Sequence, residues 1–485
     1  MKSVSIKKNL FYQMLYEVLA LSLPLITSPY VSRVLGADRI GIYSYTSSIA
    51  TYFGLFCMWG VRFHGNREIS KVKGDKELLS KAFIDIYFLQ FCVSILIVLL
   101  YLGYSICVSD YFELSLIQLL CVISYMLDIN WFFWGLELFK QVSIRNIMVK
   151  LITCAATFVF VKEPNDLWKY CLILASGTFA GNVVLWLYLP RYVYVCKPCL
   201  DRVKKNIKPM IILFVPILST SIYNYMDKIM VGSMSSKSEL GYYENSEKIL
   251  YCLRTAVLSV GTVMMPRITS MVSNGDNKQM EKYMKNSFDL IMWIAFAFSF
   301  GMASVAQKFS IIYWGEGYSS CGILLIGLSV ALPICAIGNY FRMQVLIPHD
   351  MDKQFIIATI MGAIFNAIFN TLLIPNYGAV GAVYGTIIAE IVLCAGQVLF
   401  AKRIVKIKMY LLRIIPCFSI GLVMYYVVHV MDGFLDVSVF SLLCEIIVGA
   451  MVYCTLGICF IYITNRNLVD EIFGKFVKRR RNVKE

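Results

Sequence analysis

The residues of this chain that could do chemistry are ionisable side chains inside long apolar stretches. An ionisable group in the hydrocarbon of a membrane costs at least about 2.5–3.5 kcal/mol, so each one requires a partner, water or a function. Four cations could bind an anion, and they are Arg33, Lys228, Arg254 and Arg342. Four acids could exchange a proton or a cation, and they are Glu17, Asp128, Asp227 and Glu390. A further acid, Glu445, is interpreted as a buried, neutralised or hydrogen-bonded group.

The sequence contains no recognisable catalytic motif in addition to these charged residues. The sequence has no phosphate-cradling Gly-rich loop with its Lys, and its histidines (His64, His349 and His429) are scattered. It also has no sizeable outward-facing loop on which an active site could sit. We therefore expect no catalytic residue, no bound metal and no cofactor.

The elements that hold these charges are predicted to be membrane-spanning helices. Of the 485 residues, 59% are hydrophobic and 15% are charged, whereas soluble domains have ~25% charged residues. A hydrocarbon core about 30 Å thick is crossed by about twenty helical residues. By this criterion the chain has about fourteen spans, at 10–31, 41–61, 82–107, 114–135, 147–161, 167–189, 210–231, 249–265, 288–312, 323–346, 355–374, 380–401, 411–430 and 439–463.

Loop charge predicts the orientation. The formal net charge of +15 is not gathered in one patch, so nucleic acid is not an expected partner. Lys and Arg instead fall in alternate intervals between the apolar stretches, as they do in cytoplasmic loops. Intervals such as 239–244 lean acidic and are expected outside. The alternation places both termini in the cytoplasm.

An internal repeat predicts two similarly oriented lobes. The motif around Pro24 leads to Ile40-Gly-Ile-Tyr, and the motif around Pro216 leads to Leu240-Gly-Tyr-Tyr. The offset is about six spans, an even number, so both halves enter the membrane in the same direction, and such parallel repeats are a transporter architecture. The predicted fold is therefore all-α, with an N-lobe at 1–208, a C-lobe at 209–408, two further spans at 409–465 and a basic cytoplasmic tail at 466–485.

The repeat predicts a polar, net cationic cavity between the lobes. It places the first, seventh and eighth spans around this cavity, with Glu17, Arg33, Asp227, Lys228 and Arg254. Such a cavity would suit a large anionic, hydrogen-bonding substrate. Alternatives remain open: Arg33 and Lys308 could extend to the membrane interface. Asp227 and Lys228 point about 100° apart on a helix, and the pair could be purely structural.

Five motifs in order resemble the polysaccharide transporter branch of the multidrug/oligosaccharidyl-lipid/polysaccharide exporter superfamily, the Wzx-type flippases. The motifs are SPYVSRVLGADRIGIYSYTSSIATYF from Ser28, WGVRFHGNREIS from Trp59, LDINWFFWGLELFKQVSIRNIMVK from Leu127, YNYMDKIMVG with ELGYYENSEKI from Tyr223, and FRMQVLIP with FNAIFNTLLIPNYGAVGAVYGTIIAE from Phe341. The resemblance covers nearly the whole chain.

This resemblance implies a function and a location. The expected activity is flipping of undecaprenyl-diphosphate-linked oligosaccharide repeat units, for O-antigen, lipopolysaccharide or capsule, across the bacterial inner (cytoplasmic) membrane. Membrane lipids, the polymerase and other polysaccharide assembly proteins are the implied partners. A cationic lumen carried onto this sequence would involve Arg33, Lys228, Arg254 and Arg342, with Asp227 in the same motif.

Two other functions are alternatives. A multidrug or cation antiporter of the same superfamily fold would need an acidic, aromatic-lined cavity, and the net cationic set argues against it. A glycan polymerase or ligase would need a large loop with catalytic polar groups, which the sequence lacks.

Overall fold

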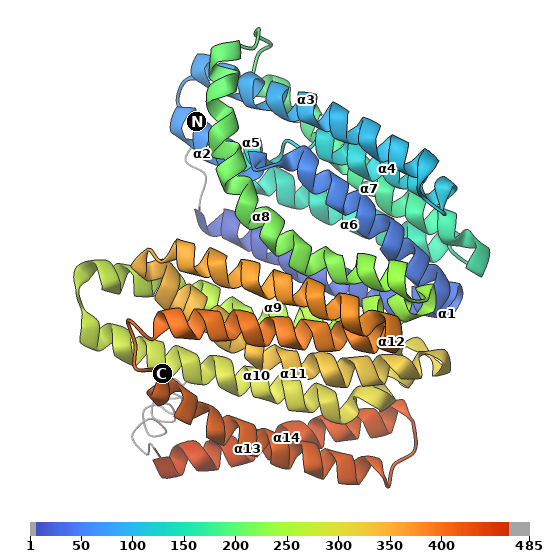
Figure 1. Ribbon diagram of the computed structural model, residues 1–485, viewed down its shortest axis with the longest axis vertical. Coiled ribbons are helices and arrows are strands. Elements are labelled where there is room, and N and C mark those ends of the chain that lie inside the picture. Colours follow the sequence, from blue (N-terminus) through green and yellow to red (C-terminus); the bar gives the residue numbers. More distant parts are fainter. Residues whose placement is uncertain (1–5, 465–485) are drawn as a thin grey trace, which may run out of the picture. The chain divides into compact units, whose positions relative to one another are not determined.

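The computed structural model describes residues 6–464, and within that range every regular element is a helix. The side chains of residues 6–11, 216, 219, 220, 222–224, 277, 461 and 464 are not described, and the tail predicted at 466–485 lies outside the described residues. The α-helices, drawn in Figure 1, are α1 (Ile6–Met58), α2 (Val61–Val72), α3 (Lys76–Cys107), α4 (Phe112–Met126), α5 (Asn130–Gly135), α6 (Phe139–Phe160), α7 (Leu167–Tyr188), α8 (Leu200–Met234), α9 (Lys237–Asn274), α10 (Asn277–Trp314), α11 (Ser319–Phe341), α12 (Asp352–Ala401), α13 (Ile407–Asp432) and α14 (Val439–Thr464). The all-α prediction is confirmed.

Eleven helical stretches of the described residues are long and apolar enough to cross a membrane. The helices α1 and α12 each contain two of the predicted spans. Each changes direction at a glycine with positive φ, Gly36 at 78° and Gly378 at 55°, because that backbone conformation does not fit a helix. The count of about fourteen spans and the cytoplasmic termini stay predictions.

Several helices begin before the spans that the sequence predicts within them. Helix α6 begins at Phe139, where the sequence predicted a span from 147, and α9 begins at Lys237, where it predicted a span from 249. Charged residues moved both predicted boundaries: Arg145 and Glu244 had been assigned to loops. Inside the helices these side chains make hydrogen bonds and ion pairs, which lower the cost of removing them from water.

The chain divides into two compact units. Unit 1 comprises Met1–Lys248 and Asn366–Gly385, and unit 2 comprises Ile249–Phe365 and Thr386–Glu485, so α9 and α12 each contribute to both. In unit 1, α1 packs against α3, α4, α6 and α8. In unit 2, α10 packs against α11, α13 and α14, and α13 and α14 form an adjacent pair (Figure 1). The lobe boundaries predicted at 208 and 408 stay a prediction.

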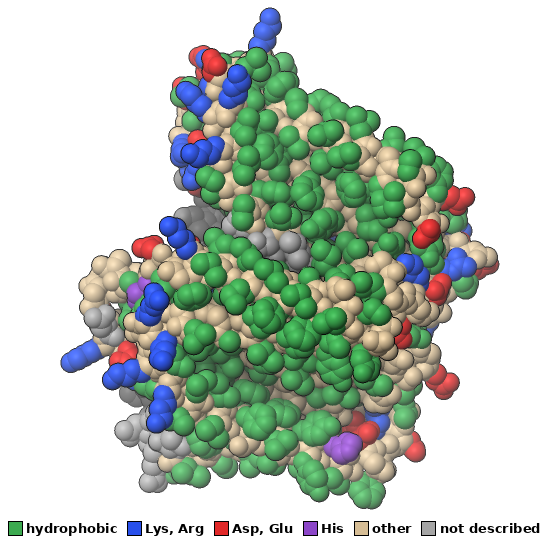
Figure 2. Space-filling view, viewed as in Figure 1, with side chains coloured by type: hydrophobic (Ala, Val, Ile, Leu, Met, Phe, Trp, Pro, Cys, Tyr) green, Lys and Arg blue, Asp and Glu red, His purple; other side chains and the backbone are tan. Residues whose placement is uncertain are grey.

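The outer surface of the helices is apolar. On the face shown in Figure 2, hydrophobic side chains cover the middle of the helices and charged side chains lie toward their ends. Leu96 and Leu99 of α3 are 57% and 59% exposed, which suits contact with lipid. The interior of unit 1 is aromatic by contrast: Trp131 and Phe132 are fully buried, and both contact Phe83.

Candidate functional site

Lys228 lies in a cluster of charged residues between α8 and α9. Its Nζ is 2.8 Å from Oε2 of Glu244 and 2.8 Å from Oε2 of Glu247. Glu244 is only 7% exposed, accepts a 2.8 Å hydrogen bond from Oγ of Ser44, and lies 3.1 Å from Nζ of Lys248. Two carboxylates therefore share two ammonium groups, and the charge of Lys228 is balanced within unit 1.

Asp227, the preceding residue, has different partners. Its Oδ2 accepts a 2.9 Å hydrogen bond from the hydroxyl of Tyr243, and its Oδ1 accepts one of 2.6 Å from Nδ2 of Asn370. The same amide nitrogen of Asn370 lies 3.3 Å from Oδ1 of Asn366. Asp227 is 4% exposed, so this carboxylate is held inside unit 1 by a phenol and an amide. The two adjacent residues thus serve separate clusters, as their angular separation on a helix allows.

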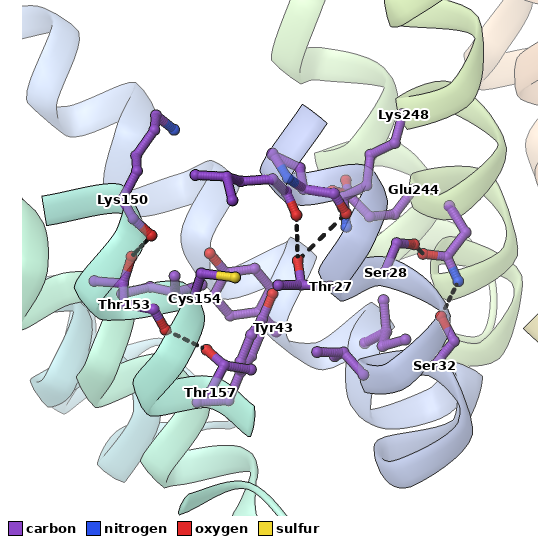
Figure 3. Close-up of a pocket in the computed structure, with 17 residues that line it drawn as sticks. Thr27, Ser28, Ser32, Tyr43, Lys150, Thr153, Cys154, Thr157, Glu244 and Lys248 are labelled. Carbon is purple, nitrogen blue, oxygen red and sulfur yellow. Dashed lines mark hydrogen bonds and ion pairs between the residues drawn. The ribbon is translucent and has the colours of Figure 1, made fainter. Parts of the chain in front are cut away.

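A cavity of about 230 Å³, lined by both apolar and polar side chains, lies beside the Lys228 cluster in unit 1 (Figure 3). Helices α1, α6, α7 and α9 line it. Hydroxyl groups dominate its polar lining, and they belong to Thr27, Ser28, Ser32, Tyr43, Thr153, Thr157 and Tyr170. Its charged lining residues are Lys150 of α6 and Glu244 and Lys248 of α9, and Asn245 adds an amide.

Asp128 belongs to a hydrogen-bonded network between α4, α5, α6 and α7. Its Oδ1 accepts 2.8 Å and 2.6 Å hydrogen bonds from the backbone N and Nδ2 of Asn130. Arg145 of α6 donates from Nη2 to Oδ1 of Asn130 at 2.6 Å and from Nη1 to Oδ1 of Asn182 at 3.4 Å. Asn182 in turn donates to the carbonyl and the Oγ of Ser124, each at 2.9 Å. The network joins four helices of unit 1.

Three predicted residues lie in unit 2, within a second polar region. Nη2 of Arg254 in α9 is 3.5 Å from Oε1 of Glu390 in α12, and Glu390 is 2% exposed. Arg342, at the end of α11, donates from Nη2 to Oδ1 of Asn339 at 2.6 Å, and its guanidinium carbon lies 5.3 Å from the ring centre of Phe355. Its Nε is buried without a hydrogen-bond partner.

The remaining predicted residues lie on the first half of α1. Glu17 is exposed and accepts a 2.9 Å hydrogen bond from Nε2 of Gln13. Arg33 is also exposed. Neither residue contributes to the lining of the unit 1 cavity, which uses other positions of α1.

Lys308 and Glu445 form a buried ion pair in unit 2. Lys308 of α10 is 5% exposed, Glu445 of α14 is 0% exposed, and Nζ of Lys308 also lies 2.6 Å from Oδ1 of Asp432 at the end of α13. The ammonium of Lys308 is thus held by carboxylates of two other helices. Glu445 is a buried, paired group, as the sequence predicted.

Four polar residues of unit 1 were not predicted as site residues from the sequence: Lys150, Arg145, Glu244 and Glu247. Helical spacing was the signal that could have found them. Lys150 shares one face of α6 with Thr153, Cys154 and Thr157, and Glu244 is spaced three and four residues from Glu247 and Lys248. Within the described residues, no group of three or more metal-ligating side chains is found.

A family model described as "Polysaccharide biosynthesis protein" matches residues 6–272 of the chain. The chain belongs to the polysaccharide biosynthesis protein family. The resemblance found in the sequence motifs is thereby confirmed at the level of the family.

Two relatives of this polysaccharide biosynthesis protein carry descriptive names. One from Escherichia coli (strain K12), named "Putative O-antigen transporter", is 21% identical over 408 residues, which are 82% of this chain and 97% of the relative. One from Haloferax volcanii, named "Probable low-salt glycan biosynthesis flippase Agl15", is 22% identical over 241 residues, which are 49% of this chain and 50% of the relative.

Two solved structures show the same fold. The lipid II flippase MurJ in an inward closed conformation superposes with a TM-score of 0.76 at 15% identity, over 94% of this chain and all of MurJ. An inward-facing multidrug resistance MATE family transporter of the MOP superfamily gives a TM-score of 0.59 at 14% identity, over 79% of this chain and 94% of the transporter. The family member described here therefore has a fold common to MurJ and MATE transporters.

Proposed function

We propose that this protein is a flippase for lipid-linked oligosaccharides. Its substrate would be an undecaprenyl-diphosphate-linked polysaccharide repeat unit, moved from the inner to the outer leaflet of a bacterial cytoplasmic membrane. The observation that carries the proposal is the match along 97% of the E. coli relative named as an O-antigen transporter. The family match and the polar groups inside membrane-length helices support it.

The physical task of such a protein is to move a polar headgroup through hydrocarbon. A diphosphate with several sugars would lose tens of kcal/mol of hydration in bare lipid, because isolated charges are that costly at low dielectric. The lipid tail can stay in the bilayer throughout. A hydrated passage lined with hydrogen-bonding groups removes most of this cost, and we propose that the two lobes alternate in exposing it to either side.

The predicted cations give this passage its preference for anions. We propose that Arg33, Lys228, Arg254 and Arg342 act on the diphosphate, with Arg engaging phosphate oxygens in pairs. Because Lys228 and Arg254 already contact carboxylates, the proposal requires that substrate phosphate competes with Glu244 and Glu390 for them. Such exchange of partners is one way in which substrate could shift the protein between two states.

The driving force has two candidate sources. A doubly charged anion that moves outward gains about 4–5 kcal/mol at ~100 mV, inside negative, at ~2.3 kcal/mol per charge. Exchange of a proton or Na⁺ at Glu17, Asp128, Asp227 or Glu390 is the other source. Asp227 accepts hydrogen bonds from two different residues of unit 1 and is 4% exposed.

A deletion strain of the host tests the function. We expect loss of surface glycan and accumulation of lipid-linked repeat units on the inner leaflet, with normal susceptibility to cationic drugs. Unchanged surface glycan together with increased drug susceptibility would contradict the proposal and favour the cation antiporter.

A further inference from the structure

The cavity of unit 1 contains a lysine, Lys150, that has no role in the proposed diphosphate path. Lys150 lies in the middle of α6, which extends from Phe139 to Phe160, and it lines the cavity. No carboxylate of the described residues lies within ion-pair distance of its ammonium. An ionisable group in the middle of a membrane-length apolar helix indicates a function by default, because an ammonium without a partner is costly in hydrocarbon.

The charges that line the cavity add up to a single positive charge. Lys248 is paired with Glu244 at 3.1 Å, so the ammonium of Lys150 is the surplus charge. Figure 3 shows the two lysines on opposite sides of the cavity, Lys150 on α6 and Lys248 on α9. One surplus charge matches a monoanion such as a carboxylate, whereas a diphosphate would need more cations.

The uncharged polar side chains of the lining suit a sugar. Thr27, Thr153 and Thr157 donate their hydroxyl protons to carbonyls of their own helices, at 3.2, 3.1 and 2.8 Å. Their oxygen lone pairs therefore stay available to accept hydrogen bonds from hydroxyl groups of a ligand.

Other lining residues add an amide and two aromatic rings. Asn245 is fixed between Ser28 and Ser32 by hydrogen bonds of 3.4 and 2.9 Å. Tyr43 and Tyr170 meet edge to face with ring centres 4.9 Å apart. The volume of about 230 Å³ is several times the ~30 Å³ of one water, and is of the size of a single sugar ring.

We propose that this cavity binds one carboxylated sugar residue of the transported glycan, with the carboxylate paired to Nζ of Lys150 and the ring hydroxyls on the Ser, Thr and Asn groups. This inference rests on the proposed flippase function. It narrows the substrate to repeat units that contain an acidic sugar, such as a uronic acid. The diphosphate of the carrier is the competing source of negative charge.

Binding measurements on the full chain in lipid nanodiscs test this assignment. The probes are two polyprenyl-diphosphate-linked disaccharides, one ending in glucuronate and one in glucose. We expect the wild-type protein to bind the glucuronate probe about tenfold more tightly, the order expected for one charge-assisted hydrogen bond. Lys150→Met should remove this preference, Lys150→Arg should keep most of it, and Lys140→Met, an exposed lysine of the same helix, should leave it unchanged.

The possible outcomes separate the inference from the function on which it rests. Equal wild-type affinity for the two probes, or a preference that survives Lys150→Met, overturns the acidic-sugar site and leaves the flippase proposal standing. An equal loss for both probes in Lys150→Met assigns the lysine to the diphosphate and also overturns the site. If neither probe binds, the proposed function itself fails, and the inference fails with it.

A second pair of variants tests the hydroxyl groups that line the cavity. Thr153→Val removes a hydroxyl that lines the cavity, and we expect it to weaken both probes by about threefold. Thr178→Val is the matched control, because Thr178 is exposed on α7 and also donates to its own helix, at 2.9 Å. Equal affinities in the two variants would contradict a sugar in this cavity.

Discussion

Gly41 of α1 and Gly241 of α9 pack against each other's helices in a reciprocal way. A Cβ at Gly41 would collide with the carbonyl oxygen of Lys237, and a Cβ at Gly241 would collide with that of Ala37. Lys237 lies one helical turn before Gly241, and Ala37 lies one helical turn before Gly41. Two positions of the internal repeat thus meet inside unit 1, and the hydrogen bond from Ser44 to Glu244 joins a further equivalent pair.

We expect either Gly41→Ala or Gly241→Ala to destabilise the protein. The added methyl has a backbone carbonyl as its neighbour, which a rotamer change cannot move away, so a cost of about 1–3 kcal/mol or more is expected. Thermal unfolding of the purified protein measures it. Gly103→Ala in α3 is the control, because its Cβ meets open space and should be neutral or slightly stabilising. Equal melting temperatures for all three variants would disprove the close packing.

Lys228→Met should lower stability strongly, since it leaves Glu244 buried next to fewer cations. Breaking a buried ion pair costs about 3–5 kcal/mol. Because the penalty comes from the stranded carboxylate, the double variant Lys228→Met/Glu244→Gln should recover much of it. A double-mutant cycle on thermal stability measures the coupling, and strictly additive effects would show that the pair is not coupled.

Asp227→Asn should abolish glycan export if this carboxylate carries the coupling ion. The amide also accepts fewer hydrogen bonds than the carboxylate it replaces, so a loss of about 1–3 kcal/mol in stability is expected. Tyr243→Phe removes one of the same hydrogen bonds and keeps the charge, so export should persist. Surface glycan, normalised to protein level, distinguishes the two variants, and normal export in Asp227→Asn would exclude a coupling role.

Arg254→Ala should reduce glycan export at unchanged protein level and topology, since it removes a cation of the proposed diphosphate path. Arg254→Lys should be partly tolerated, because it keeps the charge and loses the planar fork. Immunodetection of surface glycan measures the effect. Wild-type amounts of glycan in the Arg254→Ala strain would remove this residue from the path.

Lys308→Met should loosen the attachment of α14, because Glu445 loses its buried partner. We expect a loss of about 3–5 kcal/mol, recovered in part by a second change, Glu445→Leu. The control is Lys285→Met on the same helix, whose exposed ion pair with Glu281 is worth under ~1 kcal/mol. Limited proteolysis between α13 and α14 reports the loosening, and equal cleavage of both variants would contradict it.

The sequence alone determined the fold class and the repeat. Apolar stretches of membrane length require helices, because backbone groups in hydrocarbon must bond within their own segment. The glycines at 41 and 241 were visible as an echo in the sequence, and both prove to be packing positions. Residues such as Asp227 and Lys228 were identifiable because an ionisable group inside an apolar stretch stands out against its neighbours.

Only the tertiary structure decided which charges are paired and which helices contain them. Glu244 had been assigned to an outer loop, because a carboxylate near the end of an apolar stretch is cheapest in water. Its pairing with Lys228 and Lys248 reverses that preference, and the helix extends past it. Lys150 was missed for a different reason. Its spacing places it on one helix face with Thr153 and Thr157, but its role depends on a cavity formed by four helices, which local sequence does not encode.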